Sequence, residues 1–355
     1  DNPSLTADKL NFSPYVIERF RKGDDPIMFP SVDWNKYIFK NLAWQTQHSA
    51  TISGGGDRIR YFVSGGFLEQ DGMLKKMYES YDPNYNYKRF NYRSNIDIDL
   101  TGTTLLKLNV GGRTGTRREP VTDALWQKIM WATPFSSPGF VDGKYIANSH
   151  SNYIPLAELS SGLDYYYNWG YRKVRSNELN LDLALEQQLG FITKGLKFKA
   201  NFSMDYTFVE NKRGVNDMYH NSQRMWVRPD TGEIILEQPE LGTGLDAIIN
   251  PIYWEHQAGS VNTGATYRKL YYSMQMDYAR NFGKHEVTAL ALFSRLKEAS
   301  GSVFPIYRED WVFRLTYNYA MRYFFETNGA YNGSEKFGPD YRFAFFPSFS
   351  LGWMI

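Results

Sequence analysis

The chain has 355 residues, with 40 basic and 38 acidic side chains, so its formal net charge is only +2. The charges are spread along the sequence without blocks, which excludes the clustered basic footprint of a nucleic-acid-binding protein. Cysteine is absent, so disulfide frameworks and thiolate sites are excluded as well. Aromatic residues make up 17% of the chain. Such a share is typical of membrane barrels, which place amphipathic rings at both lipid interfaces.

The hydropathy of the chain is low, with a mean of −0.51. Its longest apolar stretches fall far short of the ~20 residues that a membrane-spanning helix needs. Low hydropathy is compatible with a membrane barrel, because barrel strands alternate lipid-facing and lumen-facing residues. The sequence begins at Asp1 without an initiator Met or the basic and apolar regions of a signal peptide. We therefore interpret it as a mature product or an internal fragment.

In chain order, the sequence predicts about eleven β-strands. Apolar and polar side chains alternate with a period of two residues in these segments. Between Glu178 and Glu186, for example, leucines alternate with mostly polar residues. Each predicted strand is near or above the ~9–11 residues that cross a membrane when tilted. The strands are expected at residues 44–53, 58–68, 87–100, 104–116, 173–189, 196–208, 264–281, 285–296, 311–319, 322–332 and 343–354.

Short and long connections alternate between these strands, as in membrane barrels with tight turns at one rim and long extracellular loops at the other. A short helix is expected at 121–131, and a hairpin around 229–232, where Asp-Thr-Gly supplies turn chemistry. The short turns fall at 53–57, 101–103, 191–195, 282–284 and 319–322, and the long loops at 69–86, 117–172, 209–262, 297–310 and 332–342.

The alternation also predicts which side chains face lipid. Lys197, Lys199, Asp97 and Asp99 should face inward. The strand count has a further consequence, because bacterial single-chain barrels have even numbers of strands and an open edge is not tolerated in lipid. We expect an open sheet whose first and last strands do not pair with each other. The outward-facing residues should be Leu106, Leu108, Leu179, Leu181, Leu183, Leu185, Phe198, Phe202 and Met204.

Several motifs, in the right order, resemble the SusC/RagA family of TonB-linked outer-membrane proteins. Residues 53–72 are similar to that family's early barrel hairpin, which consists of SGG, a short turn, a tyrosine strand and a Gln-x-Gly element. The sequence departs from the family pattern at Asn332, where Asp is usual. Further matching stretches are Val32-Asp33-Trp34, Arg314–Tyr319 with Arg322-Tyr323, Gly333-Ser334, Phe337, Phe346–Ser350 and Gly352-Trp353.

The resemblance implies an all-β fold, an antiparallel up-and-down segment of a transmembrane barrel. The segment would hold about 11 strands of a roughly 22-stranded barrel, and the plug domain would be absent from it. Residues 1–43 would be an extracellular loop segment leading into the barrel, and residues 44–355 the partial barrel. The intact protein would lie in the bacterial outer membrane and import oligosaccharides or peptides. Its partners would be a SusD-like surface lipoprotein and the TonB–ExbB–ExbD complex.

No motif indicates catalysis, a cofactor or a metal site. The five histidines are scattered without metal-ligand spacing, and Gly54–Gly56 joins two strands and opens no helix. Asp97 and Asp99 share a strand face, but a polar lumen explains them more simply than glycoside hydrolysis. The chain is thus not expected to be an enzyme.

Aromatic residues in the two longest loops are candidates for substrate contact, because aromatic rings stack on sugars and clamp peptides. The alternative is that these rings pack the loops together or form the outer aromatic girdle. The candidates are Trp126, Trp131, Tyr165, Tyr166, Tyr167, Trp169, Tyr253 and Trp254.

A second function class stays open at this point: a secreted β-rich protein that binds or hydrolyses carbohydrate and uses the same aromatic residues in water. The strand faces distinguish the two classes. A soluble sandwich must bury its apolar faces in one core, whereas a continuous outward apolar band requires lipid.

Overall fold

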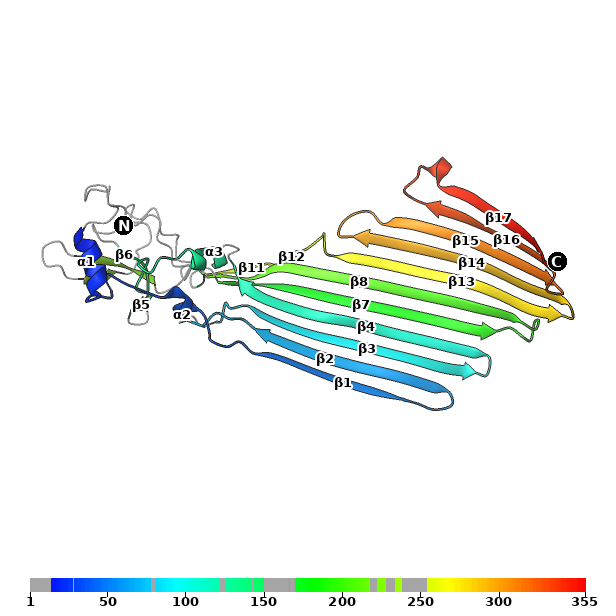
Figure 1. Ribbon diagram of the computed structural model, residues 1–355, viewed down its shortest axis with the longest axis horizontal. Helices are drawn as coiled ribbons and strands as arrows, with labels where there is room; N and C mark the ends of the chain where they lie inside the picture. The colour runs from blue at the N-terminus through cyan, green and yellow to red at the C-terminus, as the bar shows by residue number, and fades with distance from the viewer. Residues whose placement is uncertain are drawn as a thin grey trace.

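Eleven strands form one continuous antiparallel meander in which every strand pairs with its neighbours in sequence along the sheet (Figure 1). This confirms the predicted all-β class. The computed structural model describes residues 14–27, 29–77, 81–121, 125–141, 144–149, 166, 170–217, 222–227, 234–237 and 254–355. The meander consists of β1 (Gln45–Gly55), β2 (Ile59–Asp71), β3 (Asn86–Thr101), β4 (Thr104–Pro120), β7 (Tyr171–Gln188), β8 (Leu196–Asp217), β13 (Tyr267–Phe282), β14 (His285–Ser300), β15 (Ile306–Tyr319), β16 (Tyr323–Ser334) and β17 (Phe343–Trp353).

All eleven predicted strands are present, but several extend further at the loop end than predicted. β8 continues nine residues beyond the predicted end at 208, and β15 begins at Ile306 instead of 311. The predicted long loop at 297–310 is therefore only the short connection 301–305. The physical reason is that side-chain alternation ends where charged residues begin on both faces, while the backbone pairing continues.

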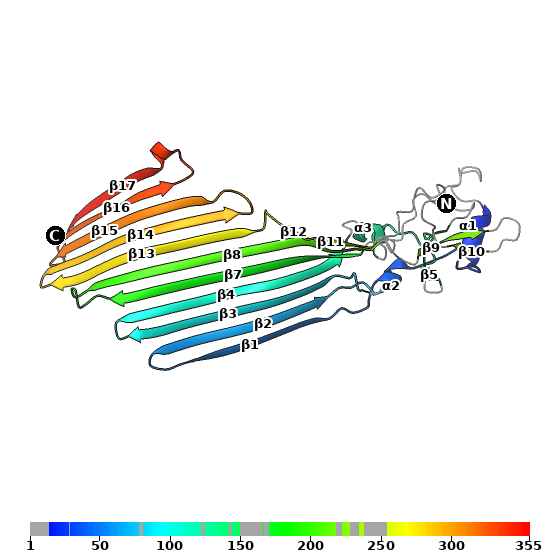
Figure 2. The same ribbon diagram turned by 180° about the vertical axis from the view of Figure 1, so that it is seen from behind.

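The predicted placement of the connections at two opposite ends of the sheet is confirmed, although the predicted long loop between β14 and β15 is shorter than the turn between β7 and β8. Because neighbouring strands are antiparallel throughout, the turns after β1, β3, β7, β13 and β15 lie at one end of the sheet and the remaining connections lie at the other. Figures 1 and 2 show the five turns along one rim and the long connections gathered at the opposite end. We call these two ends the turn rim and the loop rim.

Cross-strand register separates the side chains into two faces. Leu108, Leu183 and Phe202 are directly paired across β4, β7 and β8, so they share one face. Asp97 pairs with Lys107 on the opposite face. The predicted grouping of the leucines, Phe198, Phe202 and Met204 against Lys197, Lys199, Asp97 and Asp99 is confirmed, and we call the two sides the apolar face and the polar face.

The sheet is open. β1 and β17 stand at opposite ends of the strand order, do not pair with each other, and are exposed along their whole length. In Figure 2 they form the two far edges of the sheet. This confirms that the first and last strands leave unpaired edges.

Smaller elements gather beyond the loop rim. The expected helix at 121–131 is present as α3 (Leu125–Met130), and the expected hairpin around 229–232 consists of β9 (Ser222–Val227) and β10 (Ile234–Glu237). β5 (Phe140–Val141), β6 (Lys144–Ser149), β9 and β10 form a second sheet that was not predicted. Also unpredicted are α1 (Pro14–Lys22), α2 (Trp34–Ile38), the 3₁₀ turn η2 (Pro339–Tyr341), β11 (Trp254–Gln257) and β12 (Ser260–Val261), the last two pairing with β8.

In the part of the chain that the structure describes, no second layer covers the large sheet (Figures 1 and 2). Large apolar side chains on its apolar face stay exposed, for example Leu183, Phe313 and Phe349. The buried core lies instead beyond the loop rim, around Trp34 and Leu125. A single layer with an open apolar face cannot be a soluble sandwich, because a sandwich buries that face against a second sheet.

Candidate functional site

The polar face carries ion pairs that run from strand to strand. Arg60 of β2 contacts Asp99 of β3, with Nη1 and Oδ2 3.2 Å apart. Glu186 of β7 is shared by Lys107 of β4, at 3.1 Å, and Lys197 of β8. Further pairs on this face are Arg113–Glu178, Lys199–Asp277, Lys269–Asp205 and Arg314–Glu326. The face is therefore a charged but balanced wall, as expected for the lining of a water-filled lumen.

At the loop rim, an apolar core fixes the outer segments against each other. Ile38 of α2, Leu74, Leu125 of α3 and Tyr166 are fully buried there. Trp34 begins α2, and its Nε1 donates a hydrogen bond to the Thr133 carbonyl at 2.8 Å. We call this unit, made of residues 29–44, 71–77, 81–86 and 125–141 with Tyr166, the outer loop cluster.

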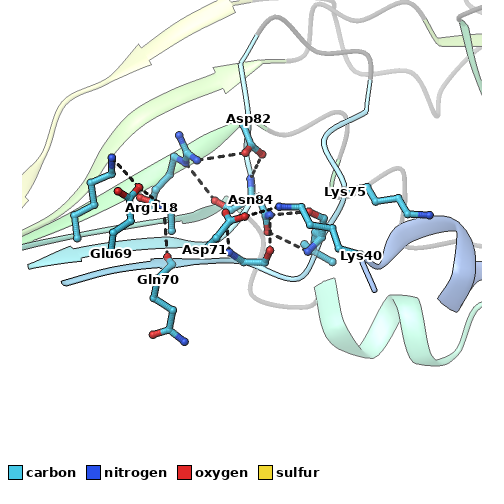
Figure 3. Close-up of polar contacts among 12 residues, drawn as sticks. Lys40, Glu69, Gln70, Asp71, Lys75, Asp82, Asn84 and Arg118 are labelled. Atoms are coloured by element: carbon cyan, nitrogen blue, oxygen red, sulfur yellow. Dashed lines mark hydrogen bonds and ion pairs between the residues drawn. The ribbon is translucent and has the colours of Figure 1, made fainter. Parts of the chain in front are cut away.

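A buried amide connects the outer loop cluster to the sheet (Figure 3). Asn84 is completely buried, and its Nδ2 donates to the carbonyls of Gly72 and Leu74 at 3.1 and 2.6 Å. Its Oδ1 accepts from the Leu74 N–H at 3.3 Å. Arg118 of β4 donates to the Asn84 carbonyl at 3.2 Å and contacts the Asp82 carboxylate at 3.5 Å. The loop end of β2 and β3 is thus held in one conformation.

Gly72 is required by this arrangement. A Cβ atom on Gly72 would lie 2.3 Å from Asn84 Oδ1 and 2.4 Å from the Tyr85 carbonyl, closer than any ordinary contact. This gives a physical reason for the glycine of the Gln-x-Gly element. Beside it, Lys40 Nζ and Asp71 Oδ2 form an ion pair at 2.7 Å (Figure 3).

A groove of about 710 Å³ lies on the outer loop cluster, between α2 and the segment around Lys75. Its lining combines three lysines, Lys36, Lys75 and Lys76, with the rings of Tyr37 and Phe140. Asp33 caps α2, and the hydrogen bond from the Lys36 backbone N–H lowers the pKa of its carboxyl. The sequence analysis did not single out this groove, because its lysines come from segments about 40 residues apart.

Two of the predicted aromatic residues pack within the outer loop cluster. Trp126 stacks nearly parallel to Phe39 and Tyr85, with ring centroids 5.7 Å away in both cases. Tyr166 is fully buried, and its hydroxyl donates to the Lys75 carbonyl at 3.0 Å. In this conformation the two rings pack the outer loop cluster together, which is the alternative to substrate contact that the sequence left open for the loop aromatics.

Trp131 differs, because 72% of its surface is exposed just beyond the end of α3. Trp254 begins β11 and pairs with Asp217 of β8 through the backbone. The remaining candidates, Tyr165, Tyr167, Trp169 and Tyr253, lie outside the described residues. Of the eight candidates, Trp131 is thus the one whose described side chain is mostly open to a ligand.

The described residues contain no helix long and apolar enough to span a membrane. Nor do they contain a group of three or more His, Cys, Asp or Glu side chains arranged for a metal ion.

No protein-family model matches the chain. TonB-dependent receptor P3 of Formosa agariphila is 24% identical over 372 residues, which cover 98% of this chain and 34% of that protein. TonB-dependent receptor SusC of Bacteroides thetaiotaomicron is 22% identical over 371 residues, which cover 92% of this chain and 32% of that protein.

Among solved structures, the RagAB peptide importer in its open-open state superimposes with a TM-score of 0.55 and 17% identity. The match covers 98% of this chain and 39% of the matched chain, so it extends over the whole open sheet. The chain is thus similar over nearly its whole length to SusC/RagA-type TonB-dependent receptors, and its open sheet matches part of the barrel of such a receptor. The family works in the bacterial outer membrane and consists of transporters, not enzymes.

The chain spans about a third of the length of the curated relatives that it matches. The predicted resemblance to this family, the all-β fold and the outer-membrane location are confirmed.

Proposed function

We propose that the intact receptor imports oligosaccharides or peptides across the outer membrane by gated passage. The observation that carries this proposal is the two-faced single sheet. One face is apolar and uncovered, while the other carries ion pairs that extend from β2 to β16. A strand wall of this kind is stable between lipid on one side and water on the other.

Closure of the lumen requires strands beyond both open edges, and the later strands of the same receptor would supply them. An edge strand in lipid leaves its backbone donors and acceptors without partners, at a cost of several kcal/mol each. β1 and β17 both present such an edge. The proposal therefore treats this chain as one contiguous portion of a larger barrel.

Recognition of the substrate would take place at the loop rim. Trp131 supplies an exposed ring, and the groove beside α2 offers lysines next to Tyr37 and Phe140. Rings stack on sugars and on peptide side chains, and ammonium groups bind carboxylates. Tyr165, Tyr167, Trp169, Tyr253 and Trp254 remain candidates for the same role.

We infer the energy source for transport and the partner proteins from the resemblance to the SusC/RagA family. The receptor would draw on the TonB–ExbB–ExbD complex and work with a SusD-like surface lipoprotein above its loop rim. The RagAB structure is of a peptide importer, which favours peptides over glycans as the first class to test.

The secreted carbohydrate-binding alternative is not supported. A protein that is soluble in water would need a second layer over Leu183 and its neighbours, and the described residues provide none.

The test is uptake by cells that carry the intact receptor as their only importer of this type. Fluorescent oligopeptides and oligosaccharides are offered separately, with and without a functional TonB. We expect uptake of one class, abolished without TonB. Equal uptake with and without TonB, or release of the receptor from cells without detergent, would contradict the proposal.

A substitution of Trp131 tests the proposal that the receptor recognises its substrate at the loop rim. Trp131→Ala should weaken uptake at low substrate concentration and leave the amount of folded receptor unchanged, because the ring contributes little to the core. Met130→Ala is the matched control, since Met130 is also exposed and is the neighbouring residue.

A further inference from the structure

Three arginines gather on the polar face, in the halves of β3 and β4 that are nearer the loop rim. Arg89 and Arg93 belong to β3, and both lie on the same side of the sheet as Asp97. Arg113 of β4 is the direct cross-strand partner of Asn91, so it lies level with the midpoint between the two β3 arginines. Side chains at such diagonal positions are within reach of one another. We call Arg89, Arg93 and Arg113 the arginine cluster.

The two β3 arginines have no carboxylate partner among the described residues. On β2, β3 and β4, the same-face neighbours that lie directly opposite them, diagonal to them or two residues away are all neutral or basic. Arg93 Nε donates a hydrogen bond to Asn95 Oδ1 at 3.3 Å. Arg89 Nε is shielded from solvent and donates to no described atom, which is costly for a buried N–H group. Both guanidinium groups therefore keep donors for a ligand.

Glu178 and Glu119, at the margin of the arginine cluster, are already paired. Arg113 Nη2 lies 2.5 Å from Glu178 Oε1, and half of the Arg113 side chain is still exposed. Glu119 is shared by Arg117 and Arg172, at 3.0 and 2.7 Å. The ion pairs that balance the rest of the polar face thus leave positive charge uncompensated at this place.

Glycines beside the arginine cluster leave open space on the polar face. Gly66 of β2 is the direct partner of Asn91, and Gly111 of β4 is the direct partner of Arg93. A Cβ atom on either glycine would come no closer than 3.7 Å to another atom, which is an ordinary contact, and neither glycine has a positive φ. The fold therefore does not require glycine at these positions. A glycine inside a strand often marks a place where a ligand approaches closely.

The height of the arginine cluster places it at the outer mouth of the lumen. Arg93 and Arg89 are eight and twelve residues from Thr101, the turn-rim end of β3. At about 3.3 Å per residue and a tilt of roughly 40°, they stand about 20 and 30 Å above the turn rim, around the top of an apolar band ~25 Å tall. With the loop rim outside, an incoming substrate would meet these side chains early.

The spacing of the three arginines matches an extended peptide. Arg89 and Arg93 are about 13 Å apart along the strand direction, and Arg113 stands halfway, so the cations follow one another in steps of about 6.6 Å. An extended peptide presents the side chains of one face at every second residue, which gives the same step. Acidic residues at alternate positions would therefore each meet one guanidinium group.

We propose that the arginine cluster binds the carboxylates of an extended acidic peptide, so that the receptor selects acidic oligopeptides for import. The planar guanidinium group of arginine matches a carboxylate with two parallel hydrogen bonds, which are among the stronger ones in proteins. The bare backbone at Gly66 and Gly111 gives the peptide room to lie close to the wall. The inference rests on the proposed function, because it names the substrate class of the same importer.

The test uses the intact receptor, purified in detergent. Fluorescent hexapeptides with blocked ends are titrated by anisotropy: one alternates glutamate with alanine, one has the same three glutamates in a contiguous run, and one has glutamine in place of glutamate. Unlabelled oligogalacturonate, which carries its carboxylates on sugars, is the competitor.

Two double variants are compared with a matched control. Arg89→Gln/Arg93→Gln removes both uncompensated charges, and Arg89→Lys/Arg93→Lys keeps the charges without the planar fork. The control, Arg21→Gln/Lys22→Gln, removes two charges from the exposed end of α1. The melting temperature of each variant shows whether the barrel stays folded.

We expect the alternating peptide to bind wild type most tightly and the glutamine peptide least. An exposed ion pair contributes up to about a fivefold gain in binding, so the glutamine double variant should bind the alternating peptide about 5- to 25-fold more weakly. The lysine double variant should bind at an intermediate level, and the α1 variant like wild type. High salt should reduce the preference, because it screens exposed charges.

Equal binding of the glutamate and glutamine peptides, or an unchanged affinity in the glutamine double variant, would overturn the inference. Binding of the contiguous peptide or of oligogalacturonate as tight as that of the alternating peptide would overturn the match to an extended peptide. Uptake separates these failures from a failure of the transport proposal: TonB-dependent import of neutral oligomers, without a preference for acidic peptides, refutes only the arginine cluster.

Discussion

Replacement of Leu183 by Arg measures whether the apolar face meets lipid. Leu183 lies five residues from the Gln188 end of β7 and packs beside Leu108 and Phe202. At about 3.3 Å per residue and a tilt of roughly 40°, it stands about 13 Å above the turn rim, near the middle of an apolar band ~25 Å tall. An arginine at this depth should lower the free energy of unfolding by about 2–4 kcal/mol.

The matched control is Asn109→Arg, one residue along β4 from Leu108 but on the polar face. Its cross-strand neighbours are Asn95 and Asp182, so a new guanidinium would meet water and a carboxylate. We expect a change within about 0.5 kcal/mol. Both variants of the intact receptor are unfolded with guanidinium in phospholipid vesicles, and the midpoints are compared at constant slope. Equal losses for the two variants would refute the assignment of the faces.

Three further changes test the outer loop cluster and the edges. Gly72→Ala should cost about 1–3 kcal/mol, because the new Cβ collides with Asn84 and the Tyr85 carbonyl, and limited proteolysis should show earlier cleavage of the loop after β2. Tyr166→Phe should lower the melting temperature, because the Lys75 carbonyl loses its donor at about 1–3 kcal/mol; an unchanged value would contradict the packing role. The chain expressed alone should aggregate through β1 and β17, and a monodisperse monomer in light scattering would argue against open edges.

The membrane-crossing half of the fold could be predicted from the sequence, because lipid on one side and water on the other impose alternation on every strand. Leucines alternate with polar residues through β7, and its predicted turn-rim end, residue 189, is within one residue of Gln188. The turn-rim ends of the other strands were placed within about two residues, since tight turns there use glycine and polar residues.

The loop-rim half could not be predicted in the same way, because its strands stand in water on both faces. Lys173 and Arg175 take the positions that leucines occupy lower on β7, so the alternation disappears although pairing with β4 and β8 continues. The neighbourhood of Arg118, Lys173 and Arg213 was hidden in the same way, because these residues are distant in sequence and only the strand register places them side by side.

The surroundings of the aromatic residues in the loops could not be predicted from the sequence either. Enrichment in Trp and Tyr could not distinguish the buried Tyr166 from the exposed Trp131, because their surroundings come from other segments. Tyr166 meets Lys75, 91 residues away, and Trp126 meets Phe39 and Tyr85.

The unequal strand lengths divide the receptor into a membrane part and an outer part. β1 and β17 have 11 residues, enough to cross a membrane when tilted, whereas β8 has 22. The surplus half of β8 leaves β13 after Thr207 and pairs instead with β12 and β11, so its backbone groups stay satisfied above the bilayer (Figure 1). β4, β7 and β8 thus rise as a paired wall that carries the outer loop cluster. Substrate contacts at this height can vary in sequence without disturbing the alternation that lipid imposes below.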